Sequence, residues 1–107
     1  MAFKITANPK FDANLTFTAQ GADLKCKVTF RHMGRKAFES LFATVFDNRK
    51  DPVGAEADAV LAVVDSWDIE CPLDNGSVEK LCDEYPGFGI ALLQGYQKAF
   101  VTHLKGN

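Results

Sequence analysis

The first third of the chain alternates apolar and polar residues. The alternation runs through residues 3–6, 15–19 and 24–32, where aromatic, aliphatic and β-branched residues share one phase. This period of two is typical of strands with one buried face. The breaks at 8–9 and 20–23 carry turn residues, and the second break is short enough for a hairpin. The pattern therefore predicts three strands, with the last two joined as a hairpin.

The rest of the chain places apolar residues at the spacing of one helix face. This i, i+3, i+4, i+7 pattern starts after Gly34 and is interrupted by turn residues at 50–54 and 70–76. Ser77 is a favourable N-cap, and Pro86 is a favourable first residue of a helix. We expect four helices, over residues 38–47, about 55–65, 78–84 and 86–105.

The order of these elements predicts an α+β fold. Residues 1–33 form the predicted β region, and residues 34–107 form the predicted helical region. Strands followed by a run of helices are typical of this class. The 107 residues contain no internal repeat and no linker, and this is the usual length of one domain. We expect a single domain with a small antiparallel sheet followed by about four helices.

The charge is divided unevenly along the chain. Residues 1–50 carry nine basic and four acidic side chains, whereas residues 51–107 carry three basic and ten acidic ones. Two oppositely charged halves favour internal complementarity or head-to-tail association. The formal net charge of −2 argues against a dedicated nucleic-acid binder, because such proteins are usually basic.

Several classes of protein are excluded by the sequence. The most apolar run, residues 55–64, is interrupted by Glu56 and Asp58, and a membrane-spanning helix needs about 20 apolar residues. Residues 1–10 lack the pattern of a signal peptide. The odd number of cysteines and the lack of a C-x-x-C pair favour reduced thiols in a cytoplasm over disulfides or a zinc site. The cysteines are Cys26, Cys71 and Cys82.

The sequence offers no catalytic, cofactor-binding or metal-binding constellation. His32 and His103 have no nucleophile or orienting carboxylate nearby, so we expect both on the surface. The acidic stretch 65–74 lacks the ligand spacing of a calcium loop. Residues 87–89 begin like a dinucleotide-binding fingerprint, but the third glycine is missing. We therefore expect a protein that works by binding, without enzymatic activity, cofactor or metal.

One alternative is a small nucleic-acid-binding accessory protein. Basic side chains gather on the predicted strand 24–32 and just after it, and a basic sheet surface with aromatic residues can follow a phosphate backbone. The simpler interpretation is that these charges form the solvated face of an amphipathic strand. The residues concerned are Lys25, Lys27, Arg31, Arg35 and Lys36.

A series of short motifs runs through the chain in a fixed order. In the first half, Thr29-Phe30-Arg31-His32 precedes a helix with an early Phe38. The second half continues with Ser66-Trp67-Asp68-Ile69, Pro72-Leu73, the run from Val78 to Tyr85-Pro86-Gly87, Tyr96 and Gly106-Asn107. In this order and spacing, residues 24–107 resemble a family of tail assembly chaperones of long-tailed bacteriophages and prophages.

The resemblance implies a non-enzymatic role in virion morphogenesis. Members of the family bind the tape measure protein before the tail tube polymerises around it. They keep its apolar helical segments soluble in the host cytoplasm, and they are absent from the mature virion. Several copies on one client would favour a homo-oligomer. The apolar helix faces and acidic rim of residues 55–107 suit such a client.

The resemblance also selects four positions that define the architecture. We expect them to pack in the core and at helix junctions, or to contact the client directly. They are Trp67, Tyr85, Pro86 and Tyr96.

Overall fold

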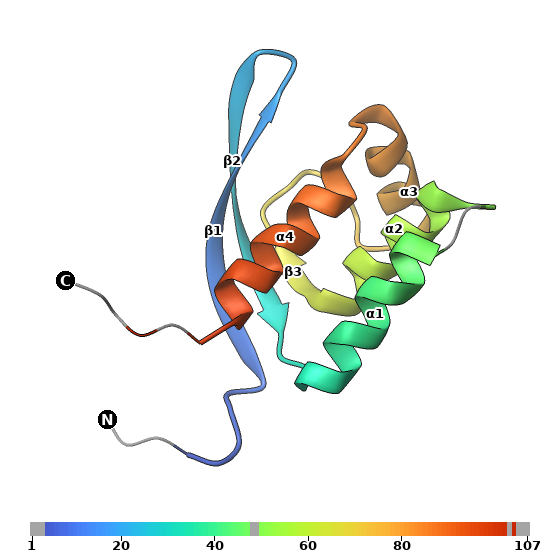
Figure 1. Cartoon of the computed structure of the whole chain (residues 1–107). Coiled ribbons are helices and arrows are strands. Elements are labelled where there is room, and N and C mark those ends of the chain that lie inside the picture. The colour runs from blue at the N-terminus through green and yellow to red at the C-terminus, as the bar shows by residue number, and fades with distance from the viewer. Residues whose placement is uncertain (1–3, 48–49, 103, 105–107) are drawn as a thin grey trace.

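The fold combines a three-stranded antiparallel sheet with four helices, and the third strand follows the second helix along the chain (Figure 1). The computed structural model describes residues 4–47, 50–102 and 104. The α+β class predicted from the sequence is confirmed. The elements are β1 (Lys10–Ala19), β2 (Ala22–Arg31), α1 (Arg35–Asp47), α2 (Pro52–Val63), β3 (Val64–Trp67), α3 (Asn75–Glu84) and α4 (Phe88–Phe100).

The strands β1 and β2 form a long hairpin around a two-residue turn. Gln20 and Gly21 both have positive φ values, 52° and 77°, which suit the right-handed twist of the flanking strands. Phe11 pairs with Phe30, and Phe17 pairs with Leu24. Because side chains alternate across a strand, the apolar residues of both strands lie on one face, towards the helices. The hairpin tip extends beyond the helices (Figure 1).

The strand β3 differs from the sequence prediction, which continued a helix to Asp65. The helix α2 ends at Val63, and Val64 takes up an extended conformation with φ −94° and ψ 122°. Val64 then pairs with Phe30, and Trp67 pairs with Val28. Val64 is β-branched, and β-branched residues favour strands over helices. In the extended conformation this segment also forms backbone hydrogen bonds with the edge of β2. The order of strands in the sheet is β1-β2-β3.

The predicted N-terminal strand over residues 3–6 is not formed at the residues that the structure describes. Lys4, Ile5 and Thr6 lie outside any strand, and β1 begins at Lys10. Phe3 falls outside the described residues. Pro9 still accepts a hydrogen bond from His32 N at 2.8 Å, but its own nitrogen has no proton to donate. The ladder therefore starts directly after Pro9.

The helix boundaries differ from the prediction by a few residues, because the caps are different. Asp51 caps α2, so Pro52 belongs to the helix instead of the turn. Asp74, not Ser77, caps α3, and its carboxylate accepts a hydrogen bond from Ser77 N at 2.8 Å. The last helix starts at Phe88 rather than Pro86 and ends at Phe100, although the sequence pattern continued to about residue 105.

The core lies between the apolar face of the sheet and the helices. Tyr96 is fully buried at its centre, and its ring lies 5.0 Å from that of Phe30 and 5.6 Å from that of Phe38. Phe11 and Phe100 complete the aromatic cluster. Aromatic pairs at this separation add to the gain from burial alone, so the cluster fixes α1 and α4 against the hairpin.

Candidate functional site

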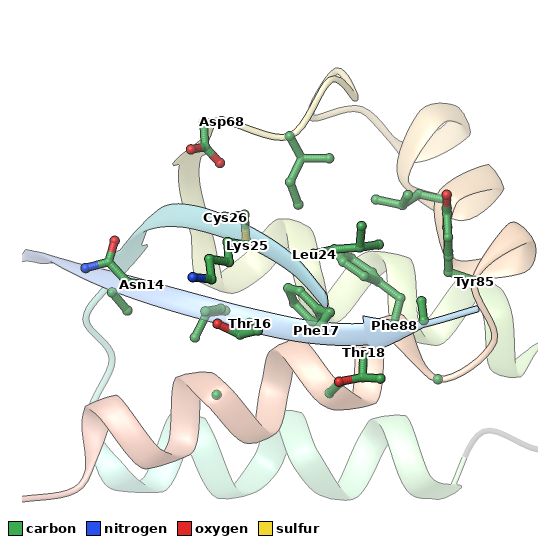
Figure 2. A pocket seen from close by; sticks show the side chains of 18 of the residues that line it. Asn14, Thr16, Phe17, Thr18, Leu24, Lys25, Cys26, Asp68, Tyr85 and Phe88 are labelled. Atoms are coloured by element: carbon green, nitrogen blue, oxygen red, sulfur yellow. The ribbon is translucent and has the colours of Figure 1, made fainter. Parts of the chain in front are cut away.

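A groove of about 720 Å³ separates the tip of the hairpin from the junction between α3 and α4 (Figure 2). Its lining is mostly apolar and comes from three parts of the chain that are distant in sequence. Pockets of this size hold small ligands or peptide segments. These parts are the hairpin at 13–19 and 24–26, the loop at 68–69, and the segment from Leu81 into α4.

The hairpin wall is apolar because the hairpin is longer than the helices that cover it. Phe17 and Leu24 form a cross-strand pair on the face that continues into the core. Further down the hairpin the same face is buried, as at Val28, which has no exposed surface. Leu24 keeps 44% of its surface exposed. The alternating pattern therefore leaves Leu24 partly uncovered at the tip, where the helices end.

The opposite wall is the bend between α3 and α4. Gly87 has φ 89°, in the left-handed region that favours glycine, and Phe88 N donates to the carbonyl of Tyr85 at 2.9 Å. This turn presents the half-buried Tyr85 and the exposed Pro86 to the groove. Phe88 connects the two walls, since its ring stacks 4.9 Å from that of Phe17 (Figure 2).

The charged side chains that border the groove are those of Lys25, Asp68 and Lys98. The Asp68 carboxylate is engaged, because it accepts a hydrogen bond from Lys27 N at 2.9 Å. The two lysines form no ion pair among the residues that the structure describes. The groove thus combines an apolar lining with two cationic groups at its border.

Cys26 contributes a thiol to this lining. Burial raises its pKa above the ordinary value of 9.0, and the Asp68 carboxylate raises it further. The thiol therefore stays protonated at neutral pH and behaves as a small apolar group. The Cys26 thiol is therefore not an activated nucleophile.

The structure separates the four positions selected from the sequence. Tyr85 and Pro86 line the groove. Trp67 is half-buried, donates from Nε1 to the carbonyl of Cys71 at 2.8 Å, and packs edge-on against Phe88. Tyr96 is fully buried and donates from Oη to the carbonyl of Arg31 at 2.8 Å. Two candidates thus face the groove, and two make packing contacts.

Phe17, Leu24 and Leu81 also line the groove, although the sequence pattern does not identify them as site residues. In the sequence, Phe17 and Leu24 belong to the apolar phase of two strands, and that phase does not indicate where the covering helices end. Leu81 belongs to the run that includes Tyr85-Pro86-Gly87, and nothing in that run indicates that Leu81 borders a groove. The position of Phe17 and Leu24 next to the hairpin turn is the sequence feature that could have indicated a groove residue.

The basic strand residues are interleaved with carboxylates. Asp65 lies 3.2 Å from Lys10 Nζ and 3.5 Å from Arg31 Nε. The Asp68 carboxylate accepts a hydrogen bond from the backbone N–H of Lys27. A protein that follows a phosphate backbone needs a continuous positive surface, and these aspartates interrupt it. This arrangement favours the solvated-face interpretation over nucleic-acid binding.

The remaining candidates for chemistry lie apart. His32 is exposed and its ring lies 5.8 Å from that of Phe100, while His103 falls outside the described residues. Cys82 is buried and Cys71 is half-buried. No group of three potential metal ligands occurs among residues 4–47, 50–102 and 104. Across the same residues, no helix is long and apolar enough to span a bilayer.

Comparison with known proteins gives a family for the whole chain. No curated protein and no solved structure matches the sequence significantly. The family described as phage tail assembly chaperone matches residues 1–107. This match covers both walls of the groove as well as the core. The chain therefore belongs to a family of phage tail assembly chaperones.

Proposed function

We propose that this chaperone binds the tape measure protein during tail morphogenesis, and that the client docks in the groove between the hairpin tip and the α3–α4 junction. The observation that carries the proposal is the apolar groove in a chain of this family. A chaperone must cover apolar surface of its client, and Leu24 and Tyr85 offer such surface from opposite walls. The role requires binding alone, so we infer a non-enzymatic protein.

The chemistry of the groove indicates the kind of segment it suits. Phe17, Leu24 and Leu81 favour a client segment with an apolar face, such as one side of an amphipathic helix. Lys25 and Lys98 favour acidic residues beside that face. We propose that the chaperone acts on this segment in the host cytoplasm, before the tube assembles, and is absent from the mature virion.

Co-expression with fragments of the tape measure protein tests the proposal. We expect the wild-type chain to keep at least one otherwise insoluble fragment in solution. The variant L24D places a carboxylate in the groove and should abolish this effect. Because Leu24 is already 44% exposed at a hairpin tip, its replacement leaves the core intact.

The matched control is L104D, which changes a leucine that is 97% exposed and is not among the groove residues. We expect L104D to act like the wild-type chain. Failure of the wild-type chain to solubilise any of several fragments would refute tape measure binding. Equal loss of activity in L24D and L104D would refute the groove as its site.

A further inference from the structure

The strand β2 continues past the end of β3, so part of its edge is open. β2 has ten residues and β3 has four. The pairing ends where Asp68 N donates to the Lys27 carbonyl at 3.2 Å and Lys27 N donates to the Asp68 carboxylate. The chain then turns away, and Cys71 N donates to the Ile69 carbonyl at 2.7 Å. On the side away from β1, residues 22–26 therefore have no neighbouring strand among the residues that the structure describes, and we call them the open edge.

The backbone groups of Asp23 and Lys25 point out from the open edge. Backbone groups alternate in direction along a strand. Those of Lys27 point towards the β3 side, as their bonds to Asp68 show, so those of Lys25 and Asp23 point there as well. Within the described part of the chain, no group bonds with them on that side. An edge with unpaired backbone groups is a template for one more strand.

The open edge borders the groove. Leu24, Lys25 and Cys26 belong to its lining on the β2 side (Figure 2). Ile69 lines the groove from the loop after β3, and Leu81 lines it from α3. A strand added to the open edge in line with β3 therefore lies inside the groove, about 4.8 Å from β2.

We propose that the client segment binds as an extended strand paired with the open edge of β2. This inference rests on the proposed function, and it specifies the conformation that the segment adopts in the groove. An amphipathic helix satisfies its own backbone groups, so it would leave those of Asp23 and Lys25 unpaired. An extended segment forms hydrogen bonds with them, and every second side chain enters the apolar lining.

The side chains of the open edge predict the residue pattern of this segment. Leu24 and the buried Cys26 face the helices, whereas Lys25 lies on the solvent face between them. Lys25 is exposed and forms no ion pair among the described residues. Cross-strand neighbours share a face, so an acidic residue opposite Lys25 with an apolar residue on each side fits best. Asp23 already accepts a hydrogen bond from Thr18 Oγ1 at 3.1 Å, and its charge disfavours a second acidic residue opposite it.

The variant K25P tests the pairing with the open edge. Proline has no N–H, and the Lys25 N–H points away from β1, so the hairpin ladder stays intact. We use a tape measure fragment that the wild-type chain keeps soluble on co-expression, and we expect K25P to lower its soluble amount several-fold. K25A removes the same charge but keeps the N–H, so it should retain most of the effect, because one exposed charge pair contributes little.

The matched proline control is T16P. Thr16 pairs with Lys25 across the hairpin, and its N–H points from the outer edge of β1 instead of the open edge. We expect T16P to act like the wild-type chain.

Amide hydrogen exchange of the wild-type chain provides a second measurement, which does not depend on the folding of a variant. We expect binding of the same fragment to slow exchange several-fold at the N–H groups of Asp23 and Lys25. The N–H group of Thr16 should exchange at an unchanged rate.

The outcomes separate this inference from the proposed function. Full activity of K25P, together with loss of activity in L24D, would overturn strand addition and leave the groove as the client site. Equal loss in K25A and K25P would assign binding to the charge and would also overturn strand addition. Protection of the Lys25 N–H that rises with the concentration of the free chain would mean that a second copy fills the edge instead. Failure of the wild-type chain with every fragment would refute the proposed function itself.

Discussion

At the scale of single residues, the two aromatic groups selected from the family motifs have different surroundings. Tyr96 is closed in by the core and satisfies the Arg31 carbonyl, whereas Tyr85 borders the groove. The sequence places both at helical positions with apolar neighbours, so it cannot distinguish them. The distinction depends on Arg31, which is 65 residues away from Tyr96 and meets it only in the folded chain.

The variant Y96F should destabilise the fold, because it removes the hydrogen bond that the Tyr96 hydroxyl donates to the Arg31 carbonyl. We expect a loss of about 1–2 kcal/mol in the free energy of unfolding. Y85F is the matched control, since Tyr85 is half-buried and borders the open groove. Urea denaturation of both variants measures the difference. An unchanged stability of Y96F would show that water or another group replaces the hydroxyl.

Asp74 makes the stability of α3 depend on pH. Hydrogen bonds from Ser77, chiefly from its backbone N–H, lower the pKa of Asp74 below the ordinary value of 3.8. A lowered pKa in the folded state means that the stabilisation is present above 3.8 and is lost as the pH falls through the folded value. The difference in stability between the wild-type chain and D74A should therefore shrink in acid. Urea denaturation at neutral pH and below the lowered pKa measures this, and a constant difference would contradict the capping role.

At the scale of elements, the sequence predicts those whose signal is local. The period of two gives the hairpin, and the helical spacing gives four helices, because each pattern repeats within one segment. The strand β3 is missed because Val60, Val63 and Val64 continue an apolar helix face up to the residue where the chain changes conformation. Its pairing with Phe30 becomes possible only once the hairpin exists.

The contact between α2 and α4 is close at Gly89. A Cβ atom at this position would lie 2.8 Å from the Cβ atom of Glu56, and the Glu56 carboxylate accepts a hydrogen bond from Ile90 N at 3.2 Å. G89A should therefore push the helices apart and destabilise the fold by about 1–3 kcal/mol.

The matched control is G76A, in the first turn of α3. There the nearest atom to an added Cβ is an Asp74 oxygen at 3.8 Å, an ordinary contact. Alanine favours a helix over glycine, so G76A should be neutral or stabilising by up to about 1 kcal/mol. Thermal unfolding of both variants compares them. Equal effects would show that helix propensity decides both sites.

At the scale of the whole molecule, the groove could not be predicted from the sequence, although half of the selected positions lie in it. Tyr85 and Pro86 were found through a motif, but Leu24 comes from the other half of the chain. The groove exists because a hairpin with ten-residue strands extends past the helices that cover its base. That mismatch of lengths depends on how the helices cross the sheet, and no local pattern encodes it.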